Sequence, residues 1–299
     1  MPYTTLISAA DLQNLVASGQ PLRVFDCTFD LMQPHAGEQQ YLDSHIPGAV
    51  YASLDTALSA RHGAPGPHGV TTATGADAPA SGGRHPLPNL ARFAEWLSSV
   101  GFSNGMQAVV YDRNGANYCG RMWWMLKWAG HANVAVLDGG LQAWVAAGGG
   151  TTQGAEAAHF QSNYALAPAL VELVATQTVA EQLGRPTQTL VDARAPARFR
   201  GDVEPLDPVA GHIPGALNRP FGQNLRPDGL FKSAEALRLE FDELLDGRDP
   251  GSVVHHCGSG VSALPNLLAM SVAGYGLTGL YAGSWSDWCS DASRPVTRG

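Results

Sequence analysis

A cysteine within a run of small residues is the part of this sequence best suited to chemistry. Cys257 follows a β-rich run at residues 252–256 and is followed by Gly-Ser-Gly-Val-Ser and an apolar run with helical spacing. A strand, a tight loop and a helix in this order direct backbone N–H groups and the positive end of a helix dipole towards one point. The pattern favours the thiolate form of Cys257 and therefore predicts a nucleophile.

Several kinds of thiolate chemistry can be compared with the residues around this loop. A tyrosine-phosphatase-like loop requires C-x5-R, but Ala263 stands at the arginine position. A papain-like protease requires an imidazole base, and His255 and His256 on the preceding strand point to opposite faces. A redox sensor requires a nearby resolving cysteine, whereas the remaining cysteines are distant and are predicted to be buried thiols. The kind of thiolate chemistry that remains is attack of Cys257 on a sulfur atom, which forms a persulfide.

Alternating strands and helices are predicted to position this loop. Apolar runs at residues 22–26, 108–112, 134–137 and 189–192 are typical of buried strands. Helical spacing occurs from Ser8 and at residues 90–97, 121–128 and 264–270. This order predicts an α/β fold with mostly parallel sheets flanked by helices. Residues 59–88 are rich in Gly, Ala and Pro and are predicted to form a long surface excursion without an assigned role.

The same signals occur twice along the chain. The segment H-I-P-G-A appears at residues 45–49 and again at 212–216, and Asp112 occupies the position that corresponds to Cys257. Ordered matches of this kind indicate a duplication. We therefore predict a non-catalytic domain at residues 1–147, a linker at 148–168 and a catalytic domain at 169–299. Asp112 would mark the place where the first domain lost its nucleophile.

Composition limits the partners. The chain has 299 residues, 44% of them hydrophobic, and a net charge of -8. An acidic chain is not expected to bind nucleic acid or anionic membrane surfaces. No apolar run approaches the roughly 20 residues needed to span a bilayer, and the first residues do not resemble a signal peptide. A cytoplasmic location with reduced thiols is expected.

The duplicated H-I-P-G-A turns, the L-D-G-G and Y-A-G-S-W segments and the C-G-S-G-V-S loop resemble tandem-domain sulfurtransferases of the rhodanese superfamily. The loop is most similar to that of 3-mercaptopyruvate sulfurtransferases, because the thiosulfate enzymes typically carry C-R-K-G-V. The resemblance implies two tandem rhodanese-like domains. It also implies sulfur transfer from 3-mercaptopyruvate through a Cys257 persulfide to a thiol or cyanide.

The resemblance also implies roles for individual residues. Ser259 and His45 would belong to a proton relay, with Glu38 or Asp43 as its acidic member. Arg198 would bind the anionic end of the donor and Asp192 would orient its guanidinium group. The backbone of four loop residues would surround the transferred sulfur: Gly258, Gly260, Val261 and Ser262.

One position departs from the family pattern. Mercaptopyruvate enzymes usually carry a second anion-binding arginine in an E-P-R segment, where this chain has Leu206. Arg200 or Arg219 is the expected substitute.

The expected partners are a small-molecule sulfur donor and an acceptor such as thioredoxin, and no metal or organic cofactor is implied. Thiosulfate as the donor is an alternative within the same class of enzyme. A non-catalytic rhodanese-like module that binds partners or senses oxidation through Cys257 is an alternative of a different class.

Overall fold

The computed structural model describes residues 2–60 and 78–299, which form two compact units. The first unit contains residues 2–59, 89–170 and 227–231. The second contains residues 60, 78–88, 171–226 and 232–299. Residues 78–88 therefore belong with the second half of the chain, although they precede the predicted linker. The remainder of the predicted excursion, residues 61–77, lies outside the described residues.

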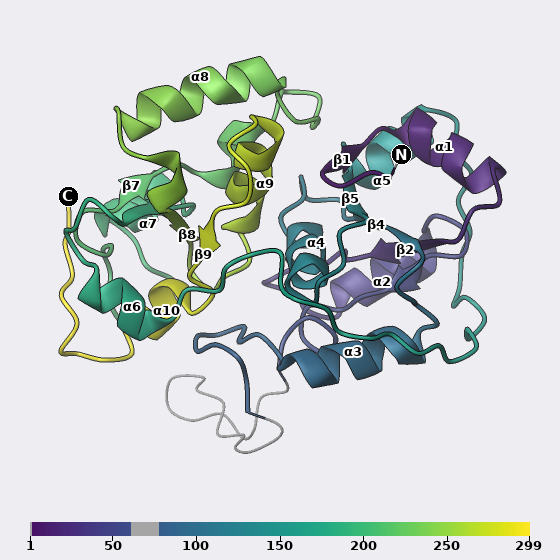
Figure 1. The fold of residues 1–299 in the computed structure, drawn as a ribbon, viewed down its shortest axis with the longest axis horizontal. Helices are drawn as coiled ribbons and strands as arrows, with labels where there is room; N and C mark the ends of the chain where they lie inside the picture. The colour runs from purple at the N-terminus through teal and green to yellow at the C-terminus, as the bar shows by residue number, and fades with distance from the viewer. Residues whose placement is uncertain (1, 61–77) are drawn as a thin grey trace. The chain divides into compact units, whose positions relative to one another are not determined.

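The first unit is built on a five-stranded parallel sheet with the order β1-β5-β4-β2-β3. Figure 1 shows α1 and α5 on one side of this sheet and α3 and α4 on the other. The strands are β1 (Leu6–Ile7), β2 (Leu22–Asp26), β3 (Val50–Tyr51), β4 (Gln107–Tyr111) and β5 (Val134–Leu137). The helices are α1 (Ala9–Ala17), α2 (Ala36–Asp43), α3 (Leu90–Ser99), α4 (Cys119–Trp128) and α5 (Gly140–Ala146).

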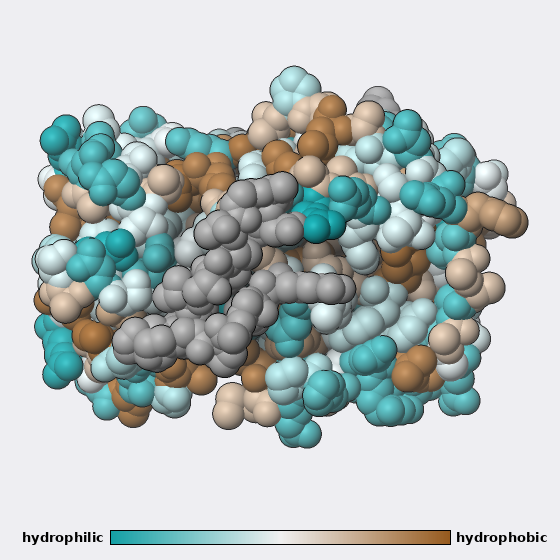
Figure 2. Space-filling view, turned by 90° about the horizontal axis from the view of Figure 1, so that it is seen from below, coloured by the Kyte–Doolittle hydropathy of each residue, from teal (hydrophilic) through white to brown (hydrophobic). Residues whose placement is uncertain are grey.

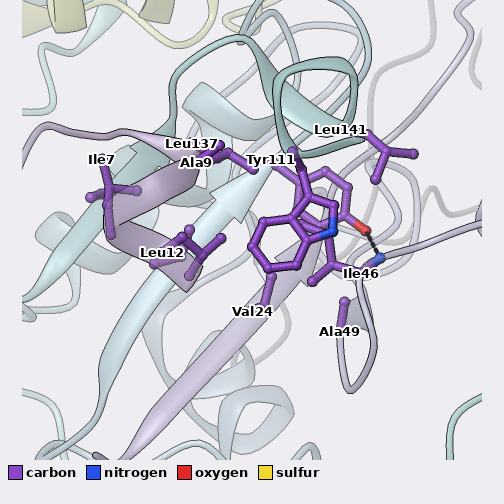
Figure 3. Packing of buried hydrophobic residues seen from close by; sticks show 12 residues of the cluster. Ile7, Ala9, Leu12, Val24, Ile46, Ala49, Tyr111, Leu137 and Leu141 are labelled. Atoms are coloured by element: carbon purple, nitrogen blue, oxygen red, sulfur yellow. Dashed lines mark hydrogen bonds between the residues drawn. The ribbon is translucent and has the colours of Figure 1, made fainter. Parts of the chain in front are cut away.

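Local sequence signals explain these elements. The Ser8 side chain accepts a hydrogen bond from the Asp11 N–H and begins α1, as its capping-box-like start predicts. Apolar residues from β2, β4 and α1 then form one core with the H-I-P-G-A turn (Figure 3). In this core the Tyr111 hydroxyl accepts a hydrogen bond from the Ile46 N–H at 3.1 Å, which fixes the turn to the central strand.

The second unit repeats this architecture with a parallel sheet of order β7-β6-β8-β9. A parallel bridge between Leu173 and Leu280 adds a fifth position beside β9, where β1 lies beside β5 in the first unit. The strands are β6 (Thr189–Asp192), β7 (Leu217–Asn218), β8 (Val253–His256) and β9 (Gly279–Leu280). The predicted α/β fold, with a helix-flanked parallel sheet in each half, is confirmed.

Helices cover both faces of the second sheet. Figure 1 shows α8 and α9 on one side and α6 and α10 on the other. These helices are α6 (Thr176–Glu181), α7 (Pro196–Arg200), α8 (Ala234–Leu245), α9 (Leu264–Val272) and α10 (Ser284–Trp288). The described residues of this unit also form the short 3₁₀ helices η2 (Phe221–Asn224) and η3 (Pro250–Ser252).

The described residues on the face of the molecule drawn in Figure 2 show no segregation of hydrophobic from hydrophilic residues, and the two kinds are interspersed. Among the described residues, no helix combines the length and the apolar character needed to cross a bilayer.

Candidate active site

Cys257 lies directly after the central strand β8, at the start of the loop that leads to α9. Cys257 is 2% exposed. The start of α10 holds this loop, because the Trp285 N–H donates to the Cys257 carbonyl at 3.0 Å and the Ser286 N–H donates to the Gly258 carbonyl at 2.9 Å. The start of α10 therefore fixes the backbone that carries the thiol.

Ser284 contributes a further contact to this backbone. Its hydroxyl accepts a hydrogen bond from the Cys257 N–H at 3.1 Å and donates to the Tyr281 carbonyl at 3.0 Å. Ser284 has a φ of 56°, a left-handed conformation that costs energy for a residue other than glycine. Gly140 occupies the corresponding place in the first unit with a φ of 59°. The hydroxyl contact to Cys257 is what serine provides at this strained position and glycine does not.

The rest of the loop depends on one glycine. Gly260 has a φ of 73°, and a side chain there would overlap the backbone of Ala282. Val261 is buried and Ser262 is half-buried. Pro265 then lies in the first turn of α9, where its missing N–H costs no hydrogen bond.

Ser259 has a histidine partner that the sequence did not reveal. Its Oγ lies 2.8 Å from Nδ1 of His85, and both residues are buried. His85 belongs to the segment for which no role was predicted. The available signal was the Arg84-His85 pair directly before the apolar Pro86-Leu87, because charged groups beside an apolar anchor are unusual in a solvent-exposed excursion.

His45 has contacts that give it a structural role. Its Nδ1 lies 2.7 Å from the Tyr41 carbonyl, its ring stacks on Tyr41, and its backbone pairs with Thr152. His212 makes the same three kinds of contact in the second unit, with the Phe199 carbonyl, the Phe199 ring and Thr297. Because the same turn recurs with the same contacts in both units, these contacts do not support the predicted pairing of His45 with Ser259.

The acidic neighbour of His45 also differs from the expectation. Nε2 of His45 lies 3.3 Å from the Glu156 carboxylate, which also accepts a hydrogen bond from the Gly48 N–H at 2.6 Å. Asp43 instead accepts a hydrogen bond from Gln39. The carboxylate comes from the segment predicted as a linker, because that segment runs back along the H-I-P-G-A turn.

The predicted pairing of Asp192 with Arg198 is wrong. Asp192 receives hydrogen bonds from Nε and Nη2 of Arg194 at 3.0 and 2.7 Å. The chain turns directly after β6, so the arginine two residues further on reaches the carboxylate first. Arg198 instead donates from Nε and Nη2 to Glu204 at 3.2 and 2.7 Å.

A second arginine lies beside the loop, and it is neither of the two expected substitutes. A Cβ built on Gly258 would lie 3.4 Å from Nη2 of Arg84 and 3.5 Å from Nη1 of Arg198. Arg200 pairs with Asp202 on the surface, whereas Arg219 pairs with Glu240. The expectation for Arg200 and Arg219 is therefore corrected: the cation next to Arg198 is Arg84.

The two histidines before Cys257 are both buried at the end of β8. Burial lowers the pKa of His255 to about 3 and also lowers that of His256. Nε2 of His255 lies 3.2 Å from the sulfur of Met270. Burial therefore favours the neutral form of both rings.

The corresponding loop of the first unit holds a carboxylate in place of a thiol. One oxygen of Asp112 accepts hydrogen bonds from the backbone N–H groups of Asn114 and Ala116 at 2.9 and 3.1 Å. The other accepts from those of Tyr118 and Cys119 at 2.8 and 2.9 Å. The loop thus forms an anion-binding nest at the start of α4, and the protein fills it with its own side chain.

This fold and this loop define a class of protein. The model of the rhodanese-like domain matches residues 8–147 and 175–291, and the chain belongs to the rhodanese family. A probable 3-mercaptopyruvate sulfurtransferase of Pseudomonas aeruginosa is 45% identical over 93% of each chain. A putative thiosulfate sulfurtransferase, SseB, of Mycobacterium tuberculosis is 41% identical over 98% of this chain and 97% of its own.

Solved structures agree with this assignment. The 3-mercaptopyruvate sulfurtransferase SseA of Escherichia coli has a TM-score of 0.74 at 28% identity, covering 95% of this chain and 99% of its own. Tum1 of Saccharomyces cerevisiae has a TM-score of 0.82 at 26% identity, covering 100% and 99%. The predicted family and the predicted class of enzyme, a sulfurtransferase, are confirmed.

Proposed function

We propose that this protein takes the sulfur atom from 3-mercaptopyruvate onto Cys257 and passes it to a thiol or cyanide. The observation that carries the proposal is the Cys257 loop with the hydrogen-bonded Ser259–His85 pair on it and two guanidinium groups beside Gly258. A nucleophile, a proton relay and an anion-binding group are what a carboxylate-bearing thiol donor requires.

The first half-reaction transfers sulfur. The Cys257 thiolate attacks the donor sulfur, an S–S bond forms and the carbon–sulfur bond breaks. The bonding electron pair leaves with the carbon as the pyruvate enolate. The donor's thiol proton passes to the Ser259–His85 pair, which returns a proton to the enolate carbon. The products are pyruvate and the Cys257 persulfide, and backbone N–H groups from Gly258 to Ser262 stabilise the negative charge on its outer sulfur.

The second half-reaction removes the transferred sulfur from Cys257. An acceptor thiolate or cyanide attacks the outer sulfur of the persulfide, and the Cys257 thiolate leaves. A reduced thioredoxin is an acceptor of the appropriate chemistry. Its first thiol takes the sulfur as a persulfide, and its second thiol then displaces hydrogen sulfide and forms a disulfide.

Intact-protein mass spectrometry tests this proposal. The protein is incubated with 3-mercaptopyruvate, freed of the donor and weighed. We expect wild type to gain one sulfur atom and to lose it again on addition of cyanide. Cys289→Ser, which removes another buried thiol of the same unit, should gain sulfur like wild type, whereas Cys257→Ser should gain none. A wild type without added sulfur after every donor would instead support a non-catalytic module.

Thiosulfate is the second candidate donor. Two guanidinium groups beside Gly258 also fit a dianion, which is consistent with the name of the Mycobacterium tuberculosis relative. Comparison of kcat/KM for the two donors decides between them. We expect the higher value for 3-mercaptopyruvate, because the Ser259–His85 relay serves an enolate leaving group and sulfite needs no such protonation.

A further inference from the structure

Arg84 lies in a position that is fixed by the element that also holds the Cys257 loop. Its backbone N–H donates to the Ser286 hydroxyl of α10 at 3.0 Å. The two residues before it pack so closely on α10 that side chains at Gly82 or Gly83 would overlap Asp287 or Gly283. Because Ser286 also bonds the Gly258 carbonyl, Arg84 and the loop share one support.

A carboxylate connects this arginine to Arg198. One oxygen of Asp207 accepts a hydrogen bond from Nη1 of Arg84 at 2.5 Å, and the other accepts from Nη2 of Arg198 at 3.2 Å. The Asp207 side chain is 3% exposed, so the carboxylate that holds the two guanidinium groups lies in the protein interior. Glu204, equally buried, fixes Arg198 through two further hydrogen bonds.

The remaining N–H groups face the loop. Nη2 of Arg84 and Nη1 of Arg198 are the atoms nearest to a Cβ placed on Gly258, and the hydrogen bonds described for these two arginines use their other nitrogen atoms. Nε of Arg84 is buried and has no hydrogen-bond partner within the described part of the chain. Guanidinium N–H groups that face the loop and are not used in these hydrogen bonds are donors that an anion can accept.

We propose that Arg84 and Arg198 together bind the carboxylate of the sulfur donor, with Arg84 supplying the cation that the chain lacks at Leu206. This inference rests on the proposed function for the identity of the donor. Arg84 is then a specificity-determining residue of the reaction. It comes from a segment far from the family's arginine position in the sequence, yet its guanidinium lies beside the residue that follows the nucleophile.

Binding to an inactive protein tests the clamp without turnover. In the Cys257→Ser background, pyruvate affinity is measured by calorimetry for Arg84→Ala and for Arg200→Ala, a matched control whose exposed arginine pairs only with Asp202 among the described residues. We expect Arg84→Ala to weaken pyruvate binding roughly 10- to 100-fold, because a charged hydrogen bond is lost. Arg200→Ala should change nothing, and Arg84→Lys should fall between. Methyl pyruvate, which lacks the charge, should bind all variants alike.

Kinetics with the active protein completes the test. Arg84→Ala should raise KM for 3-mercaptopyruvate by a similar factor with a smaller change in kcat, while thermal unfolding shows that the variant remains folded. Pyruvate binding and KM equal to those of Arg200→Ala would overturn the clamp while leaving sulfur transfer intact. A wild type that accepts no sulfur from 3-mercaptopyruvate, but whose pyruvate binding depends on Arg84, would overturn the donor assignment and uphold the clamp.

Discussion

Replacement of Asp112 by alanine should destabilise the first unit. Its buried carboxylate accepts four backbone hydrogen bonds of 2.8–3.1 Å. A hydrogen bond to a charged group contributes about 1.5 to 3 kcal/mol, but water entering the emptied nest restores part of this. We therefore expect a loss of about 3 to 5 kcal/mol, as when one partner is removed from a buried charged pair. For a unit of this size that lowers the Tm by roughly 10 °C.

Sulfate should reverse part of this loss, because the emptied nest retains its four N–H donors. If sulfate binds with a dissociation constant near 10 mM, then 100 mM sulfate restores about 1.4 kcal/mol. Asp112→Asn is the matched control, since its amide keeps the nest filled while its NH₂ group faces some of the N–H donors. This variant should be destabilised but should gain no more from sulfate than wild type does.

Calorimetric unfolding in sulfate and in sodium chloride of equal ionic strength measures both effects. Sulfate stabilises many proteins by exclusion from their surfaces, so the informative quantity is the excess stabilisation of Asp112→Ala over wild type. Equal stabilisation of all three proteins, or a loss below 1 kcal/mol for Asp112→Ala, would refute the assignment of Asp112 as the internal occupant of an anion nest.

Three further predictions concern the second unit. Ser284→Gly and Ser284→Ala both remove the hydroxyl that accepts a hydrogen bond from the Cys257 N–H, but only the alanine variant keeps the strain of a positive φ. The alanine variant should therefore be about 1 kcal/mol less stable than the glycine variant in thermal unfolding. Equal stabilities would argue against strain at this position. Because burial lowers the pKa of His255 to about 3, the unfolded state binds a proton below about pH 6.5 that the folded state does not. The free energy of unfolding should therefore fall from pH 6.5 towards pH 4 by up to about 1.4 kcal/mol per pH unit for this histidine, and His255→Gln should flatten the slope, whereas an unchanged slope would contradict a neutral buried ring. Ser259→Ala and His85→Ala should each lower kcat about 10²-fold or more, and the double variant should lose no more than either single one; additive losses would mean that the pair does not act as a unit.

The sequence was informative wherever contacts are local or periodic. Short apolar runs predicted β2, β4, β5, β6 and β8, and Ser8 predicted where α1 begins. The loop at Cys257 was also predictable, because its strand, small residues and helix are contiguous. Its glycine at position 260 is required by backbone conformation, which a sequence motif records directly.

Contacts between distant segments were not predictable in the same way. His85 and Arg84 reach the loop across more than 170 positions, and composition alone suggested an exposed excursion. The partner of Asp192 depended on the direction of a single turn after β6, which let Arg194 reach the carboxylate before Arg198. The H-I-P-G-A motif specifies the geometry of a turn. Its recurrence at His212 was the signal that favoured a structural role for His45.

The discontinuity of the second unit has a consequence for the order in which the protein is made. Residues 78–88 leave the ribosome long before Cys257 and α10, so Arg84 and His85 gain these partners only after about 170 to 200 further residues have been made. A chain cut in the segment between the two repeats would leave Cys257 in a fragment without either residue. A chain whose synthesis has not reached residue 257 therefore carries Arg84 and His85 without the loop on which they pack.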